Sequence, residues 1–100
     1  GIELSNAALG LVGGNLIGLS GGDGINGQNL AATLIAGNLV SLSGDDGIDV
    51  TNAIGVGILG NAVLGALDNG IEADNAVGAL IAGNSVIGAG NNGIQLTDAL

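Results

Sequence analysis

The feature that most constrains this chain is a tandem repeat. The stretch IAGNLVSLSGDDGIDV begins at Ile35, and its near copy IAGNSVIGAGNNGIQL begins 46 residues later at Ile81. Half of 46 is 23, and at this period the whole chain aligns without insertion or deletion. The copies are residues 1–23, 24–46, 47–69 and 70–92, with a partial fifth copy at 93–100. Such a period predicts a solenoid in which each copy is one coil of a single domain.

Alignment of the copies produces three aliphatic columns and two asparagine columns. The first aliphatic column follows the initial glycine of each copy at Ile2, Ile25, Ile48, Ile71 and Ile94. The second is Val12, Ile35, Ile58 and Ile81, and the third is Ile17, Val40, Val63 and Val86. One polar column is Asn15, Asn38, Asn61 and Asn84, and another is Asn6, Asn29, Asn52 and Asn75, continued by Asp98. No coil can bury its apolar face alone, so we expect the aliphatic columns to stack into one core.

The local pattern favours strands over helices. Ile48-Asp49-Val50 alternates apolar and polar residues, which is the period of a half-buried strand. Helical repeats need about 33 residues or more, and the 22 glycines of this chain oppose helix formation. The sequence therefore predicts an all-β parallel β-helix, a solenoid with three short strands per coil. These strands lie near the first isoleucine, near the central apolar pair and just after Gly-Asn, and equivalents pair about 4.8 Å apart.

The asparagine column that follows a glycine predicts an internal ladder. Asn15, Asn38, Asn61 and Asn84 recur in one place of the coil. Buried polar groups need partners, and identical stacked amides supply donors and acceptors to one another. A polar ligand surface is the other interpretation of these residues. We favour the ladder, with a structural role.

An acidic corner precedes each copy's first glycine. Asp45, Asp46 and Asp68 can supply oxygen ligands for calcium, although Asp and Asn are also ordinary turn residues that favour left-handed backbone in a solvated turn. We expect calcium not to be essential, because the carboxylates of coil two are replaced by Asn91 and Asn92 in coil four. Asp45, Asp49 and Asp68 can also lie close together, as paired carboxylates do in glycosidases.

Composition excludes several classes of function. The chain has nine acidic residues and no Lys, Arg or His, so it lacks the cations that bind nucleic acid or anionic lipid. It has no aromatic residue to stack on bases or sugars, and no Cys for a disulfide or a thiolate metal site. Its most apolar stretch, residues 53–67, is shorter than the roughly 20 residues of a membrane span. We therefore expect no enzyme activity, no catalytic residue, no cofactor and no membrane span.

The motif AGNSVIGAGNNGIQLTDA, with its partner AGNLVSLSGDDGIDVTNA, resembles the coil repeat of right-handed parallel β-helices in the pectate-lyase-like superfamily. The resemblance covers the whole chain and implies a right-handed coil. The family includes lyases that use Arg, Lys, His or calcium-binding acids, and also adhesins and phage tailspikes. Only the acids are present here, so the resemblance carries no catalytic residue onto this chain.

These observations favour a structural repeat module of an extracellular β-helical fibre, adhesin stalk or matrix filament that assembles by coil stacking. The chain opens on the core strand GIEL and closes on its equivalent GIQLTDAL, so both ends are expected to accept another coil. The alternatives are a non-catalytic segment of a carbohydrate-active β-helix protein and a curli-like functional amyloid. The amyloid would have two strands per coil, which the three aliphatic columns do not favour.

Overall fold

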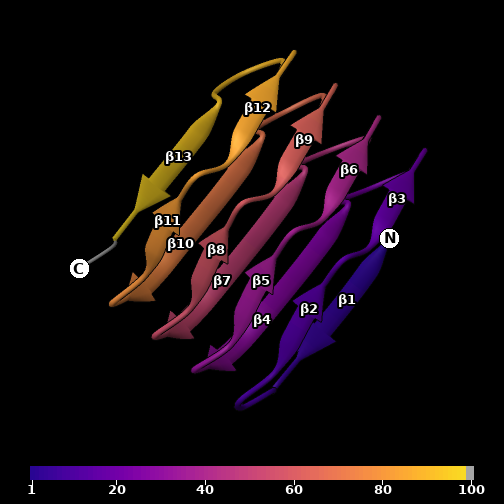
Figure 1. The fold of residues 1–100 in the computed structure, drawn as a ribbon. Coiled ribbons are helices and arrows are strands. Elements are labelled where there is room, and N and C mark those ends of the chain that lie inside the picture. Colours follow the sequence, from indigo (N-terminus) through magenta and orange to yellow (C-terminus); the bar gives the residue numbers. More distant parts are fainter. Residues whose placement is uncertain (99–100) are drawn as a thin grey trace.

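The computed structural model describes residues 1–98, which form a β-solenoid of strands and turns without a helix (Figure 1). Sheet A contains β1 (Ile2–Ser5), β4 (Ile25–Ala31), β7 (Ile48–Ile54), β10 (Ile71–Val77) and β13 (Ile94–Thr97). Sheet B contains β2 (Leu11–Gly13), β5 (Leu34–Ala36), β8 (Gly57–Leu59) and β11 (Leu80–Ala82). Sheet C contains β3 (Leu16–Gly18), β6 (Leu39–Ser41), β9 (Ala62–Leu64) and β12 (Ser85–Ile87).

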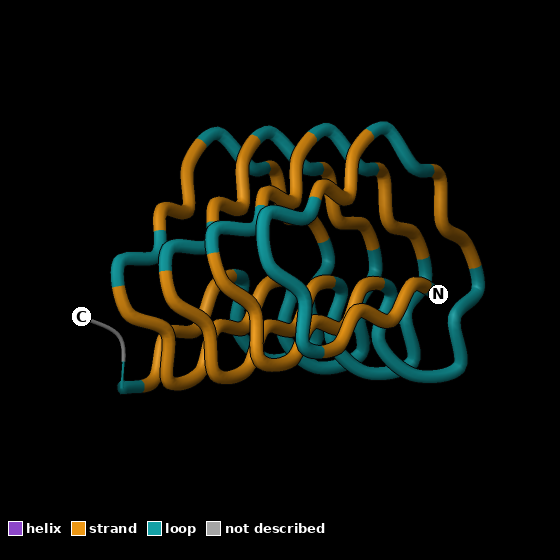
Figure 2. The backbone as a smooth tube through the Cα atoms, turned by 90° about the horizontal axis from the view of Figure 1, so that it is seen from below, coloured by secondary structure: helices purple, strands orange, loops and turns teal. Residues whose placement is uncertain are grey.

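Each coil adds one strand to each of the three sheets. Every strand pairs in parallel with its equivalents in the neighbouring coils, so that Ile48 lies beside Ile25 on one side and Ile71 on the other. Figure 2 shows the result as stacked loops of backbone in which strands recur at the same places. The predicted all-β parallel solenoid, its period and its three strands per coil are confirmed.

The aliphatic columns form the core where a coil lies between two others. Ile25, Ile48 and Ile71 are fully buried, and the central members of the other two columns are buried with them. The first and last coils differ, because nothing covers their outer side in this chain. Ile2, Ile81 and Val86 are only partly buried, and the prediction that Ile94 lies in the core is wrong here, since it is 47% exposed.

The turns use left-handed backbone at fixed places in the coil. The column Asn6, Asn29, Asn52, Asn75 and Asp98 has φ between 52° and 59°, a conformation that Asn and Asp tolerate better than most residues. Its side chains are exposed and form an interrupted outer ladder of two hydrogen-bonded pairs. The Nδ2 of Asn29 donates to the Oδ1 of Asn6 at 3.0 Å, and the Nδ2 of Asn75 donates to the Oδ1 of Asn52 at 2.6 Å. Leu19 and Leu42 also have positive φ, which the sequence did not indicate, whereas later coils have Gly65 and Gly88 there.

The predicted inner asparagine ladder is present. The backbone N–H and the Nδ2 of Asn38 both donate to the Oδ1 of Asn61 at 2.9 Å. Asn15 donates to Asn38 in the same way, and Asn61 to Asn84. The Nδ2 groups also donate to main-chain carbonyls. The Nδ2 of Asn61, for example, donates to the carbonyl oxygen of Ile35 at 3.0 Å. Asn38 and Asn61 are almost completely buried, so the ladder satisfies polar groups inside the coil.

Candidate functional site

The acidic corner lies where each coil leaves sheet C and enters sheet A. The turn before β7 carries Asp45 and Asp46, and β7 itself adds Asp49. The preceding turn contributes Asp23, and the following turn contributes Asp68. Because equivalent turns stack on successive coils, carboxylates that are far apart in the sequence become neighbours.

A second ladder runs through this corner. Asp23, Asp46, Asn69 and Asn92 occupy one column, and the Oδ1 of each accepts the backbone N–H of the next at 2.9, 2.9 and 3.2 Å. Asp46 is 3% exposed. The prediction that Asp45, Asp46 and Asp68 are turn residues with left-handed backbone is wrong in its second part, since they lie in turns but none of them has a positive φ. The ladder column of Asp23, Asp46, Asn69 and Asn92 is occupied by Asp or Asn because a short side chain with an acceptor oxygen reaches the next turn.

Side chains three residues apart pair across the start of sheet A. Asn26 donates its Nδ2 to Asp23 at 3.1 Å, and Asn92 donates to the Oε1 of Gln95 at 2.9 Å. In each of these pairs an amide meets an acceptor. The third coil lacks this complementarity, because both members of its pair are carboxylates.

That carboxylate pair is Asp46 and Asp49. When both are ionised, each can only accept hydrogen bonds. The Oδ1 of Asp49 is buried and has no hydrogen-bond partner among the described residues. Carboxylate oxygens of Asp23, Asp46 and Asp49 also lie within 4.8 Å of one another. The three acids are thus forced together by the stacking of the coils.

Burial and mutual repulsion disfavour the charged forms of these groups. Burial raises the pKa of Asp49 to about 7, and the charges of Asp23 and Asp46 add to the rise. Burial also raises the pKa of Asp46 to about 6. The hydrogen bond from the backbone N–H of Asn69 lowers this pKa, and the nearby carboxylate of Glu72 raises it further. The pKa of Asp23 is raised by burial as well. A proton shared within the cluster relieves this repulsion at mildly acidic pH.

The expected calcium trio is brought together. Carboxylate oxygens of Asp45, Asp46 and Asp68 lie within 4.8 Å of one another, and Asp46 also belongs to the cluster with Asp23 and Asp49. Oxygen ligands of this kind suit a hard cation such as calcium. Asp45, Asp49 and Asp68, which the sequence allows to lie close together, are not one of these groups, because Asp49 instead groups with Asp23 and Asp46.

We expect the protein to lose stability as pH rises from about 4 to about 8. Unfolded Asp has a pKa of about 3.9, whereas folded Asp46 and Asp49 have pKa values of about 6 and about 7. Between the unfolded and the folded pKa values, the folded state holds protons on these two residues that the unfolded state has released. Stability then falls with increasing pH. The variant Asp49→Asn removes one repelling charge and supplies a donor to Asp46. It should gain about 1–2 kcal/mol at pH 8, after allowance for solvent screening.

Denaturant titrations at pH 4.5, 6 and 8 measure this dependence. Asp74→Asn is the matched control, because it removes the same charge from sheet A outside the cluster. The free energy of unfolding of Asp49→Asn should vary less with pH than that of the control. A wild-type protein that is most stable at pH 8 would contradict the assignment of these protons.

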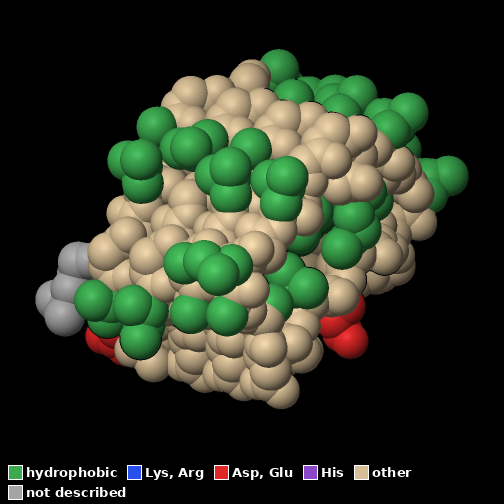
Figure 3. Space-filling view, turned by 60° about the horizontal axis from the view of Figure 1, so that its bottom comes forward, with side chains coloured by type: hydrophobic (Ala, Val, Ile, Leu, Met, Phe, Trp, Pro, Cys, Tyr) green, Lys and Arg blue, Asp and Glu red, His purple; other side chains and the backbone are tan. Residues whose placement is uncertain are grey.

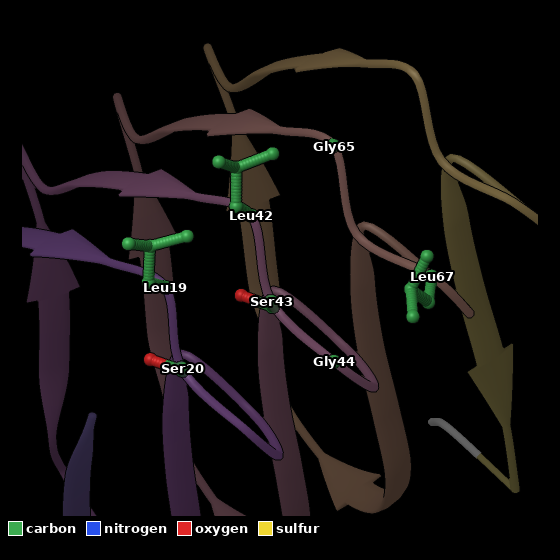
Figure 4. A pocket seen from close by; sticks show the side chains of 7 residues that line it. All are labelled: Leu19, Ser20, Leu42, Ser43, Gly44, Gly65 and Leu67. Carbon is green, nitrogen blue, oxygen red and sulfur yellow. The ribbon is translucent and has the colours of Figure 1, made fainter.

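The other notable surface feature is an open hollow of about 300 Å³ between sheet C and the acidic corner. Leu19 and Leu42 lie at equivalent positions along the hollow, and Gly65 occupies the same position in the third coil without a side chain. Leu67 also lines the hollow but lies away from this row (Figure 4). The hydroxyl oxygens of Ser20 and Ser43 are buried beside it without a hydrogen-bond partner among the described residues. The hollow is apolar and shallow, and it offers no charged group.

The second ladder and the cluster that includes Asp23 were not predicted from the sequence. The signal for the ladder was an Asp, Asp, Asn, Asn column placed before the first glycine of each coil. The column mixes charged Asp with neutral Asn, so a common role was not evident. That role is to accept a backbone N–H through one side-chain oxygen, and it does not depend on the charge. The grouping of Asp23 with Asp49 depends on which side of the strand each carboxylate approaches.

No helix in residues 1–98 is long and apolar enough to cross a membrane. Comparison of the chain with family models, curated proteins and solved structures found no match.

Proposed function

We propose that this chain is a structural module of an extracellular β-helical fibre, adhesin stalk or matrix filament, assembled by stacking coil on coil. It acts as a non-enzymatic building element without a cofactor. Calcium can be held at the acidic corner without being essential to the fold, because the corner's carboxylates are not repeated in every coil.

The supporting observation is the exposed core at the last coil. Ile94 and Leu96 of β13 are 47% and 54% exposed, whereas their equivalents Ile48 and Val50 are fully buried. Strand β13 is also an edge of sheet A, and unpaired strand edges invite pairing. A further coil, from the same polypeptide or from another chain, would bury these side chains and continue every ladder.

The charge distribution supports a solvated, extended assembly. All nine acidic residues lie in sheet A, in the turns leading to it, or at Asp98. A surface of one sign keeps such rods soluble but opposes the approach of their ends. The absence of Cys from the sequence makes the module independent of a redox compartment, and an extracellular location is part of the proposal.

Light scattering and negative-stain microscopy across a salt series test the stacking. Screening shortens the Debye length from about 30 Å at 0.01 M to about 10 Å at 0.1 M salt. Filaments should therefore lengthen as ionic strength rises. A particle that stays monomeric at every salt concentration, with intact β circular dichroism, would remove the stacking proposal.

Two lysine variants make the test specific. Leu96→Lys places a charge on the exposed end of the core and should stop elongation. Thr97→Lys adds the same charge to the neighbouring position of β13, whose side chain lies on the other side of the strand. Elongation should persist in this control.

A second candidate is a non-catalytic segment of a carbohydrate-active, right-handed β-helix of the pectate-lyase-like superfamily. The cluster of Asp23, Asp46 and Asp49 favours it, because grouped carboxylate oxygens can accept hydrogen bonds from the hydroxyls of a sugar. Binding of a neutral oligosaccharide that is lost in Asp49→Asn would support this candidate. The curli-like alternative is disfavoured, because each complete coil has three strands where such an amyloid would have two.

A further inference from the structure

The outer face of sheet B is apolar throughout. The middle residue of each of its strands points into the core, and the two flanking residues point outward. All of these outward residues are Leu, Ala or Gly. Leu11 is 70% exposed and Leu80 is 59% exposed, so the face is not covered by the chain itself. Figure 3 shows hydrophobic side chains gathered in rows on the surface, with acidic side chains only near its edge.

Each coil places one large and one small residue on this face. The large residue comes first in three coils, at Leu11, Leu34 and Leu80, and a Gly or Ala follows two positions later. The third coil reverses the order, with Gly57 first and Leu59 second. Gly57 replaces the leucine at the first outward position, and Leu59 replaces the small residue at the second. Every coil therefore keeps one projecting leucine and one recess on this face.

The same face is free of charge. None of the strands of sheets B and C contains an acidic residue, and neither do the turns on either side of sheet B. Two copies, each with a net charge of −9, repel one another most strongly through sheet A and the acidic corner. Sheet B is a face through which like chains can approach without opposing carboxylates.

We propose that sheet B pairs face to face with sheet B of a second copy, about a two-fold axis parallel to the solenoid axis. This axis places the first outward row of one copy opposite the second outward row of its partner, coil by coil. Each leucine then faces a Gly or Ala in all four coils, including the reversed third coil. Alternating large and small residues across facing positions interdigitate, as in a dry zipper between packed sheets.

The direction of the two chains follows from the same pattern. If the two copies ran in opposite directions, the first rows would face each other and Leu11 would meet Leu80. That arrangement places leucine against leucine at both ends and leaves small residues opposite one another. Parallel copies avoid this, and they form an isologous contact whose two sides are the same surface.

Sheet C also has one large and one small outward residue per coil, but Ser41 and Ser85 are among its small residues. Burial of these hydroxyls against an apolar partner carries a desolvation cost. Sheet B has no such polar side chain, so it is the drier of the two faces and the one assigned to pairing.

The pairing of this chain is weak. Two four-stranded faces bury less than the roughly 1,200 Å² of a stable interface, so the dissociation constant should be about 0.1–1 mM. Each added coil contributes another projection and recess, and the affinity rises with coil number. The contact does not depend on end-to-end stacking, since it uses the side of the rod.

Sedimentation velocity from micromolar to millimolar concentration tests the pairing, in the Leu96→Lys background that blocks stacking. The background protein should dimerise. Ala36→Leu puts two large residues in one coil and should weaken the dimer at least about tenfold. The double variant Leu34→Ala/Ala36→Leu copies the reversed order of the third coil and should return to within about threefold of the background.

Circular dichroism confirms that each variant is folded, and Leu59 shows that leucine is accepted at this outward position. A background protein that is monomeric at millimolar concentration would overturn the pairing. If the Ala36→Leu variant dimerises as tightly as the background protein, the proposed interdigitation is overturned. The affinity would then depend only on the apolar area of the face. A monomer that binds phosphatidylcholine vesicles would assign the face to a lipid surface instead.

Discussion

Replacing Asn61 with leucine is expected to lower the free energy of unfolding by roughly 3–5 kcal/mol, because each stranded buried partner costs about 1–3 kcal/mol. The backbone N–H and the Nδ2 of Asn38 both lose their acceptor, the Oδ1 of Asn61. The carbonyl of Ile35 loses the donor that reaches it at 3.0 Å. Leucine has a similar volume but no polar atom, and these groups remain buried beside it.

Thermal and denaturant unfolding of Asn61→Leu measure this loss. Asn52→Gly is the control, because it removes an amide from the exposed outer ladder and keeps a residue that accepts positive φ. The control should lose less than about 1 kcal/mol. Equal stability of Asn61→Leu and wild type would show that the inner ladder does not hold the coils together.

Replacing Gly47 with alanine is expected to destabilise the protein by about 3 kcal/mol or more, through overpacking of a site with no room. A Cβ at this position overlaps the Cγ1 of Val63 and lies 2.6 Å from the carbonyl oxygen of Gly70. One obstacle is the buried side chain of Val63, and the other is main chain of the next coil, which cannot move without breaking the ladder of sheet A. The same crowding holds at Gly24 and Gly70, which explains the glycine that begins each inner coil.

Gly22→Ala is the matched control, because a Cβ there meets nothing within 4 Å. It should leave the stability unchanged or raise it by up to about 1 kcal/mol, since alanine restricts the unfolded chain. Denaturant titration of both variants separates crowding from the general effect of replacing glycine. Similar stabilities for the two variants would mean that the coils can separate at Gly47 at little cost.

The period and the three strands per coil could be predicted because each coil repeats the same core residues. Any one isoleucine is ambiguous, but Ile25, Ile48 and Ile71 at one interval require a shared environment. The end coils could not be predicted in the same way. Ile94 has the same identity as Ile48, and its exposure depends on a neighbouring coil and not on its own residue type.

The acidic corner was only partly predictable, for a different reason. The proximity of Asp45, Asp46 and Asp68 follows from adjacent turns on successive coils. The cluster of Asp23, Asp46 and Asp49, in which Asp46 is buried and the other two are partly buried, depends on the side from which each carboxylate enters the corner. The left-handed leucines at Leu19 and Leu42 also contradict local preference, and stacking against neighbouring turns overrides that preference.

The uniform stacking of the coils has a mechanical consequence. Each coil advances the rod by about 4.8 Å, yet its 23 residues span roughly 75 Å when extended. A rod under tension that gives up one coil therefore lengthens by about fifteen times the height of that coil. Inner coils have the same kind of neighbours, so coils detach from an end one after another, at similar force. The solenoid therefore holds a large reserve of length, and unfolding coil by coil absorbs work while the chain extends.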